Sequence, residues 1–305
     1  MSALARRISY ADSATTPAGR AVVRLVENAT GRLALVRRAR ACAQAIAEGA
    51  DLWETVSQRF GIGLAVTEGA LELIPARGPL VVVANHPYGI LDGLTLGRVL
   101  SARRGRDFRI LAHKVFVSAP ELAPFILPVD FDGTEAAARA NLATRAAALA
   151  HLAAGGAIGI FPGGTVSTAA RPFGRPLDPA WRGFCARMVA RSRATVVPLF
   201  FEGHNSRLFQ LASHLHYTIR LGLLLSEFRR RTGSTVRLRV GQPIPPEALD
   251  PLRGDLPALT ACLRRATYGL SPDPVPEGEI GHEFEARYRP DPPAARVDFR
   301  RVPSY

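Results

Sequence analysis

The chain has 305 residues, of which 47% are hydrophobic and 21% are charged. This composition is typical of a globular protein and provides enough apolar side chains for one large domain or two small ones. The three cysteines, Cys42, Cys185 and Cys262, have neither zinc-site spacing nor the density of a disulfide scaffold, which indicates thiols in a reducing compartment. The histidines are also scattered without ligand spacing, so no metal site is predicted.

The net charge of +13 and the isoelectric point near 10.9 favour an acidic partner. Nucleic acid, anionic lipid headgroups and phosphate-bearing carriers all qualify, and a solvated basic surface needs no partner at all. The charge is almost all arginine, since Lys114 is the only lysine. Nucleic acid ranks last, because the sequence has no helix-turn-helix spacing, zinc finger or aromatic-studded basic strand.

The first 60 residues have helical periodicity, with a break predicted at Asn28 and Gly31. A basic amphipathic helix is predicted between Ala21 and Ala43. Its apolar positions are Val22, Val23, Leu25, Val26, Leu33, Leu35 and Val36, and its arginines are Arg20, Arg24, Arg32, Arg37, Arg38 and Arg40. Such a helix either lies among lipid headgroups or packs its apolar stripe on the protein, and both alternatives stay open.

No segment approaches the ~18 consecutive apolar residues of a spanning helix. The first ten residues also lack the apolar stretch of a signal peptide. We therefore expect a cytoplasmic protein that is peripheral on the inner face of the cell membrane, with an anionic membrane surface as one partner.

Beyond Leu71, short apolar runs alternate with helical segments. The predicted strands are Leu80–Ala84, Phe108–Ala112, Ala157–Phe161, Val196–Phe201 and Val236–Val240. The predicted helices are Leu94–Arg104, Thr134–Ala154, Pro179–Ser192 and Leu208–Thr232. This alternation predicts an α/β fold with a largely parallel central sheet flanked by helices.

Prolines crowd the chain after Tyr268 and exclude regular helix or interior strand there. They are Pro272, Pro274, Pro276, Pro290, Pro292 and Pro293. We expect an extended tail that either wraps the domain or moves freely. The predicted organisation is an N-terminal amphipathic helical segment over 1–60, an α/β domain over 61–270 and an extended tail over 271–305.

A histidine and an aspartate follow the first predicted strand, in the segment Asn85-His86-Pro-Tyr-Gly-Ile-Leu-Asp92-Gly. In open α/β sheets, loops at the carboxyl ends of strands line the ligand crevice. A histidine there can take a proton from an alcohol, and a carboxylate on its other ring nitrogen fixes the tautomer. His86 and Asp92 are therefore candidates for a general base and its partner, although a pair of backbone-capping residues would look the same.

A second loop, Phe-Pro-Gly163-Gly164-Thr165-Val-Ser167-Thr, follows the strand that ends at residue 161. Its glycines would let backbone N–H groups approach an anion, and its hydroxyls and Arg171 would add donors and positive charge. A phosphate cradle is one interpretation, although the lysine and spacing of a P-loop are missing. A plain glycine turn is the other.

Two further polar segments end strands. Lys114 comes after Phe108–Ala112 and precedes an apolar stretch. The lysine suits phosphate binding, and the apolar stretch suits either an acyl chain or a buried core. His204, Asn205 and Arg207 follow Val196–Phe201, either in the same crevice or in a solvated loop.

In this order, the four segments resemble the lysophospholipid acyltransferase superfamily over about Leu71 to Pro246. Its members carry a His/Asp block, a basic block, a Phe-Pro-x-Gly block and a Val-Pro block. Five residues rather than the common four separate His86 from Asp92, and Gly163 stands where the common block has glutamate. Both features resemble the branch of hemolysin-like acyltransferases and of the acyltransferase part of ornithine lipid synthases. So do Gly203, Asn205, Ser206, Phe209, Leu224, Glu227 and the segment from Val240 to Ile244.

The resemblance implies an O-acyltransferase without a cofactor, in which acyl-CoA or an acyl carrier protein donates the acyl group to a lysolipid hydroxyl. His86 would be the general base and Asp92 its partner. The implied substrate-binding residues are Asn85, Lys114, Gly163, Gly164, Thr165, Ser167, Arg171, Asn205 and Ser206. Gly163 in place of glutamate favours a lyso-aminolipid such as lyso-ornithine lipid as the acceptor. Lysophosphatidic acid is the alternative acceptor. A hydrolase that uses the same pair, or a catalytically silent lipid-binding protein, are the alternatives.

Overall fold

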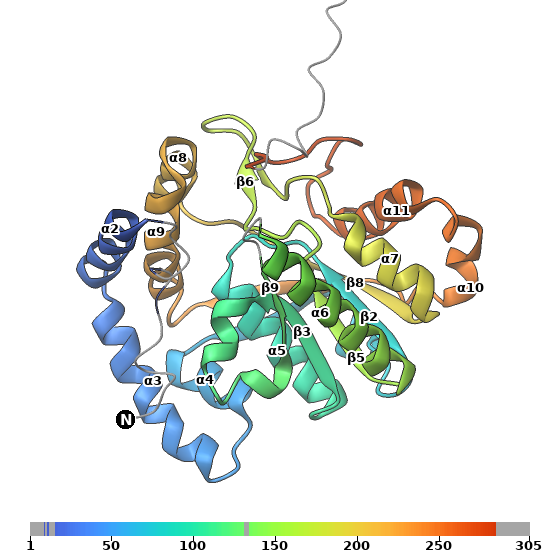
Figure 1. Ribbon diagram of the computed structural model, residues 1–305, viewed down its shortest axis with the longest axis horizontal. Coiled ribbons are helices and arrows are strands. Elements are labelled where there is room, and N and C mark those ends of the chain that lie inside the picture. The colour runs from blue at the N-terminus through green and yellow to red at the C-terminus, as the bar shows by residue number, and fades with distance from the viewer. Residues whose placement is uncertain (1–8, 10, 12–15, 131–133, 285–305) are drawn as a thin grey trace, which may run out of the picture.

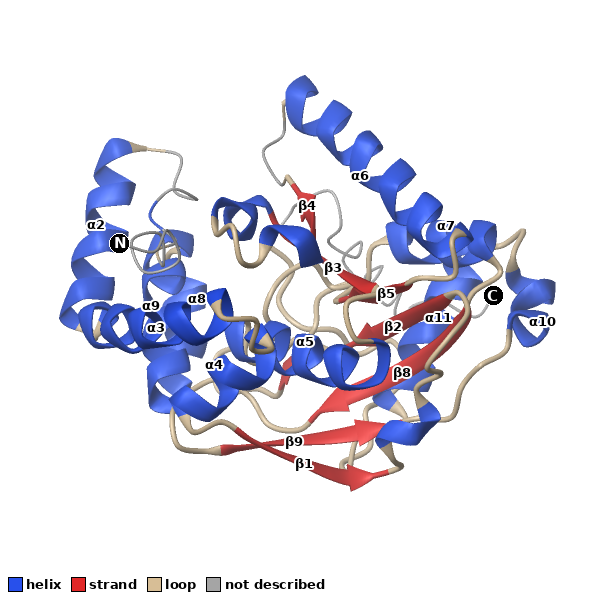
Figure 2. Ribbon diagram, turned by 90° about the horizontal axis from the view of Figure 1, so that it is seen from below, coloured by secondary structure: helices blue, strands red, loops and turns tan. Residues whose placement is uncertain are grey.

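The computed structural model describes residues 9, 11, 16–130 and 134–284. It has one seven-stranded sheet, a separate small hairpin, and helices on both faces of the sheet (Figures 1 and 2). The predicted α/β class with a largely parallel central sheet is confirmed.

The large sheet has the order β1-β9-β8-β2-β5-β3-β4. Its strands are β1 (Gly63–Glu68), β2 (Leu80–Ala84), β3 (Phe108–His113), β4 (Ile126–Val129), β5 (Ala157–Ile160), β8 (Thr195–Phe201) and β9 (Thr235–Val240). Only the β8–β9 pairing is antiparallel. The carboxyl ends of β2, β3, β4, β5 and β8 therefore all meet at one edge of the sheet.

Both faces of the sheet are apolar because helices cover both of them. In β2, Leu80, Val82 and Ala84 face one core cluster, while Val81 and Val83 face another. The first cluster includes side chains from α3 (Arg32–Ala47), α4 (Leu52–Phe60), α5 (Ile90–Arg104) and α9 (Tyr217–Arg230). The second includes side chains from α6 (Glu135–Ala153), α7 (Gly183–Ser192) and α11 (Leu256–Tyr268).

Helices α2 (Pro17–Ala29), α8 (Arg207–Leu215) and α9 gather on one side of the molecule (Figure 1). The break predicted near Asn28 and Gly31 is confirmed, since Gly31 has φ 105° and separates α2 from α3. The predicted amphipathic stripe is divided: Val23 is buried, whereas Val22, Leu25 and Leu33 are 42%, 70% and 59% exposed. In the described part of the chain, no helix is both long and apolar enough to cross a membrane.

One prediction of secondary structure is wrong, and several elements of the structure were not predicted. The single helix expected over Leu208–Thr232 is two helices, because His216 is extended (φ −162°, ψ 130°) and its ring caps α9 by accepting a hydrogen bond from the Thr218 N–H. Strands β1 and β4 were not predicted, and β4 tolerates Pro128 because it is an edge strand. Helix α11 was not predicted either, nor was the short α10 (Pro246–Leu249).

The chain from 271 to 284 has no helix or strand and lies against the domain. Arg175 donates hydrogen bonds to the Ser271 hydroxyl and to the main-chain carbonyls of Asp273 and Pro274. Further on, the chain reaches the hairpin of β6 (Thr168–Ala169) and β7 (Pro176–Leu177), where the His282 N–H donates to the Thr168 carbonyl at 2.9 Å. The rest of the predicted tail, with Pro290, Pro292 and Pro293, lies outside the described residues.

Candidate active site

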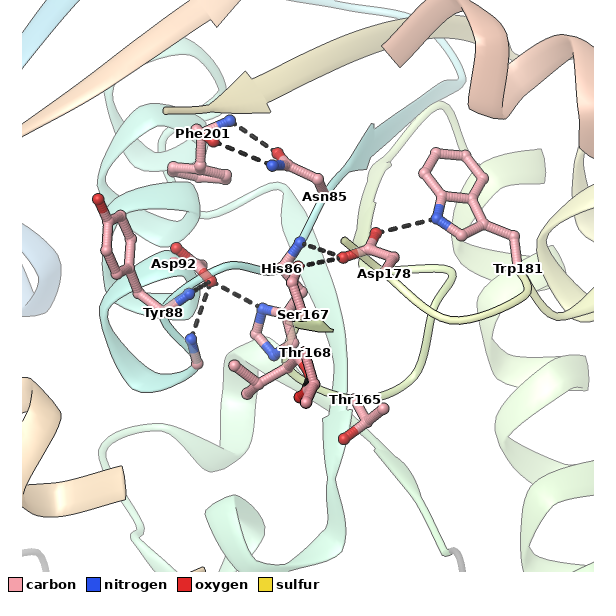
Figure 3. A network of polar contacts seen from close by, with 12 residues as sticks. Asn85, His86, Tyr88, Asp92, Thr165, Ser167, Thr168, Asp178, Trp181 and Phe201 are labelled. Atoms are coloured by element: carbon pink, nitrogen blue, oxygen red, sulfur yellow. Dashed lines mark hydrogen bonds and ion pairs between the residues drawn. The ribbon is translucent and has the colours of Figure 1, made fainter. Parts of the chain in front are cut away.

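His86 and Asp92 meet at the carboxyl end of β2 (Figure 3). The His86 Nδ1 atom lies 3.0 Å from Asp92 Oδ2, and the two side chains are 17% and 0% exposed. Asp92 is in the first turn of α5, so its carboxylate also accepts hydrogen bonds from the Tyr88 and Gly89 N–H groups at 2.7 and 2.9 Å. Asp92 thus both contacts His86 and caps α5, an arrangement that is compatible with both interpretations of the sequence.

The buried position of Asp92 affects its ionisation. Burial raises the pKa of the Asp92 carboxyl group, and the contacts with His86, Tyr88 and Gly89 only partly oppose this increase. The same contacts keep Oδ2 on the Nδ1 side of the imidazole. Nε2 lies across the ring from Asp92 and is the nitrogen that can act as a base.

The imidazole of His86 is stacked on Phe161, with ring centroids 4.1 Å apart and planes inclined by 22°. Phe161 directly follows β5, which pairs with β2 in parallel register, Val83 opposite Ile160. The first two predicted loops therefore lie side by side at the same edge of the sheet.

The second loop is a turn that supports the first loop. The Gly164 N–H donates to the Phe161 carbonyl across Pro162 and Gly163, a type of turn that favours proline at its second position. The Gly164 N–H, which was predicted to contact an anion, is thus engaged in this turn. Gly163 is buried, and a Cβ there would lie 3.1 Å from Asp178 Cβ.

Ser167 and Asp178 hold the main chain of His86. The Ser167 N–H donates to the His86 carbonyl at 2.7 Å, and the Ser167 hydroxyl donates to Asp178 Oδ1 at 2.5 Å. Asp178 Oδ1 also accepts from the His86 N–H at 3.0 Å (Figure 3). Ser167 was predicted to bind substrate; in the structure its hydroxyl is buried and engaged with Asp178, and these contacts fix the loop.

Asp178 and Arg220 were not predicted. An aspartate before a proline near a helix start is typical of a cap, and nothing in its spacing connects Asp178 with His86. Arg220 is buried on α9 and donates to the Thr165 hydroxyl at 2.9 Å and to the Val166 carbonyl at 2.8 Å. Thr165 is thus held by a distant helix.

Asn85 and Ser206, two of the predicted substrate contacts, both form hydrogen bonds within the protein. The Asn85 amide exchanges two hydrogen bonds with the Phe201 main chain, at 2.9 and 2.7 Å, which ties the first loop to β8. The Ser206 hydroxyl donates to Glu227 at 2.6 Å and caps α8 by accepting from the Phe209 N–H. Both side chains hold the fold.

The other predicted substrate contacts lie in three places. Lys114 follows β3, is 44% exposed and lies 3.0 Å from Asp130. Arg171 is exposed between β6 and β7. Asn205 is fully enclosed, and neither of its amide atoms has a hydrogen-bond partner among the residues that the structure describes.

Comparison with known proteins identifies the family of the chain. A family model described as Acyltransferase matches residues 52–272. The lyso-glycine lipid O-acyltransferase of Phocaeicola vulgatus is 28% identical over 186 residues, which are 59% of this chain and 64% of that protein. The protein of the same name from Bacteroides thetaiotaomicron is 25% identical over 186 residues, 59% of this chain and 66% of that protein.

The chain thus spans just under two thirds of the length of these curated relatives. Among solved structures, the 1-acyl-sn-glycerophosphate acyltransferase of Thermotoga maritima aligns with a TM-score of 0.42 and 16% identity, over 78% of this chain and 81% of that one. The match of the family model covers well over half of the residues, and on this ground the chain belongs to the acyltransferase family.

Proposed function

We propose that this protein transfers a fatty acyl group to the hydroxyl of a lysolipid, with His86 as general base. His86 Nε2 takes the proton of the hydroxyl as its oxygen attacks the thioester carbonyl. The C–S bond then breaks, and the leaving thiolate receives the proton from the imidazolium. Asp92 holds Nδ1 and stabilises the positive charge. The 3.0 Å contact between His86 and Asp92 at the carboxyl edge of the sheet is the observation that supports this mechanism most directly.

The proposed acceptor is a lyso-aminolipid. Two relatives carry the name lyso-glycine lipid O-acyltransferase, and Gly163 replaces the glutamate of the commoner Phe-Pro-Glu-Gly block. Lyso-glycine lipid, lyso-ornithine lipid and lysophosphatidic acid are the acceptors to compare. Acyl-CoA and acyl carrier protein are both proposed donors, because the chemistry at the thioester is the same.

Acyl transfer by the purified protein tests this proposal. The protein is incubated with a radiolabelled acyl thioester and each acceptor in turn, and labelled lipid is measured beside free fatty acid. We expect acceptor-dependent transfer that falls on the order of 10²–10⁴-fold in His86→Ala. The matched control is His216→Asn, which keeps the cap of α9 and should transfer normally.

The same assay separates the alternatives. Release of free fatty acid without an acceptor identifies a hydrolase. Lipid binding without turnover of either thioester identifies a catalytically silent protein. Transfer that persists in His86→Ala would contradict the proposed role of that residue.

We also propose that the protein associates peripherally with an anionic membrane, on the cytoplasmic face of the cell membrane. Support comes from α2 and α3, where Leu25 and Leu33 are exposed and where Arg20 and Arg24, both on α2, are exposed as well. Exposed apolar residues flanked by arginines match the composition of helices that lie in the headgroup region.

A further inference from the structure

A second buried carboxylate lies next to the His86–Asp92 pair. Asp178 is 0% exposed and directly follows β7. Its Oδ1 accepts hydrogen bonds from the His86 N–H at 3.0 Å and from the Ser167 hydroxyl at 2.5 Å, and its Oδ2 accepts from the Trp181 indole N–H at 2.9 Å (Figure 3). Hydrogen bonds to a charged acceptor are stronger than neutral ones, so Asp178 holds its donors firmly.

These contacts close a ring around the main chain of His86. The His86 N–H donates to Asp178, the His86 carbonyl accepts from the Ser167 N–H, and the Ser167 hydroxyl donates to Asp178. Both peptide groups that flank the His86 Cα are therefore fixed by partners far away in the sequence. Residues outside the loop therefore fix the position of the His86 Cα atom, from which the imidazole projects.

Asp178 is itself immobilised. Its N–H donates to the Tyr268 hydroxyl of α11 at 2.8 Å, and its carbonyl accepts from the Gly281 N–H at 2.7 Å. A Cβ on Gly163 would lie within 3.1 Å of its side chain, so glycine leaves room for Asp178. Through its main chain and its side chain together, Asp178 thus connects α11, the segment near 281 and the glycine turn to the catalytic loop.

We infer that Asp178 is a positioning residue, which sets where His86 Nε2 lies relative to the acyl acceptor. This inference rests on the proposed function. Asp178 is not a second base, because it is enclosed and its two oxygens already accept three donors. A misplacement of a catalytic group by about 1 Å can cost on the order of 10²-fold in rate, so a residue that only holds the main chain can still control turnover.

The geometry offers a test based on one amide oxygen. In Asp178→Asn, only one amide oxygen remains as an acceptor. It can face either the donors of His86 and Ser167 or the indole of Trp181, and in both orientations the amide NH₂ faces another donor. The additional substitution Trp181→Phe removes the indole donor and lets the oxygen settle toward His86. We expect kcat to fall about 10- to 100-fold in Asp178→Asn with KM nearly unchanged, since positioning acts in the transition state. The double variant should recover most of the loss.

Trp181→Phe alone is the matched control. It keeps the carboxylate and both contacts of Oδ1, so kcat should stay close to that of the wild type. If Asp178 only stabilised the fold, the double variant would be at least as impaired as Asp178→Asn, because it also loses part of a buried tryptophan. That result would overturn the inference, as would a change confined to KM. Circular dichroism melts confirm that each variant is folded at the assay temperature.

A second measurement does not depend on acyl transfer. Diethyl pyrocarbonate modifies accessible neutral imidazoles, and peptide mass spectrometry gives the rate at His86. We expect faster modification in Asp178→Asn and a return toward the wild-type rate in the double variant. An unchanged rate in Asp178→Asn would refute the positioning role. If the wild type transferred no acyl group while this pattern held, the proposed function would fail and the structural link between Asp178 and His86 would stand.

Discussion

The imidazole of His86 lies almost parallel to the ring of Phe161, with 4.1 Å between the ring centroids. Phe161 covers one face of the ring, while Asp92 holds its Nδ1 edge. These two contacts limit rotation of the side chain, and the contacts of Ser167 and Asp178 limit movement of the main chain. The proposed base is therefore held from four directions before any substrate arrives.

We predict that Phe161→Leu lowers kcat and leaves the protein folded with little loss of stability. Leucine keeps the apolar contact but cannot stack, and an aromatic pair contributes about 0.5–1.5 kcal/mol beyond its buried area. If this stacking energy selects the productive rotamer of His86, kcat should fall about 2- to 10-fold, as steady-state kinetics would measure. Phe161→Tyr retains the stack and should stay near the wild-type rate. Equal losses in both variants would contradict the role of the ring.

Asp92→Asn should abolish most activity and yet raise stability at alkaline pH. Burial raises the folded-state pKa of Asp92, so the folded protein keeps this proton to a higher pH than the unfolded chain does. The free energy of unfolding therefore decreases as pH rises from the ordinary aspartate range through the raised folded value. Asparagine removes this ionisation while its oxygen still accepts the loop N–H groups.

Urea unfolding across pH measures this effect. The asparagine variant should exceed the wild type in stability above the folded pKa of Asp92, and the difference should shrink as pH falls toward the ordinary aspartate range. Asp255→Asn, at the exposed N-cap of α11, is the control and should show no such gain. A variant less stable than the wild type at every pH would contradict the prediction.

Gly163→Ala should destabilise the protein and reduce transfer. The added Cβ would lie 3.1 Å from Asp178 Cβ, 3.3 Å from its Cγ and 3.4 Å from Pro179 Cδ. Because three donors hold the Asp178 side chain, it cannot easily move away from the new methyl group. Overpacking of this kind typically lowers the free energy of unfolding by about 1–3 kcal/mol. Gly254→Ala has no atom within 4 Å of the new Cβ and serves as the control in thermal melts and assays.

Replacement of Leu25 and Leu33 by serine should weaken binding to anionic vesicles. Both side chains are exposed on α2 and α3, and each loses apolar area that would otherwise enter the headgroup region. Leu142→Ser on α6 is the matched control, since Leu142 and Leu33 are both 59% exposed. Vesicle flotation measures the bound fraction, which should also decrease with added salt. Equal weakening by Leu142→Ser, or equal binding to neutral vesicles, would argue against α2 and α3 as the membrane contact.

The sequence alone determined those features that depend on short-range spacing. The strand at 80–84, the loop after it and the first turn of α5 form one continuous unit, so the proximity of His86 and Asp92 follows from local geometry. The parallel sheet follows for a similar reason, because apolar runs that alternate with helices are readable along the chain. The same logic placed the break between α2 and α3 at Gly31.

Only the tertiary structure decided which residues support this unit. Asp178 lies 92 residues from His86, and Phe201 lies 116 residues from Asn85. No periodicity connects positions so far apart, and Asn85, Ser167 and Ser206 carry polar groups that suit a ligand as well as a backbone partner. Their role depends on which loops the strand order brings to the carboxyl edge of the sheet. The physical reason is that hydrogen-bond partners at such distances are chosen by packing, which a single sequence does not display.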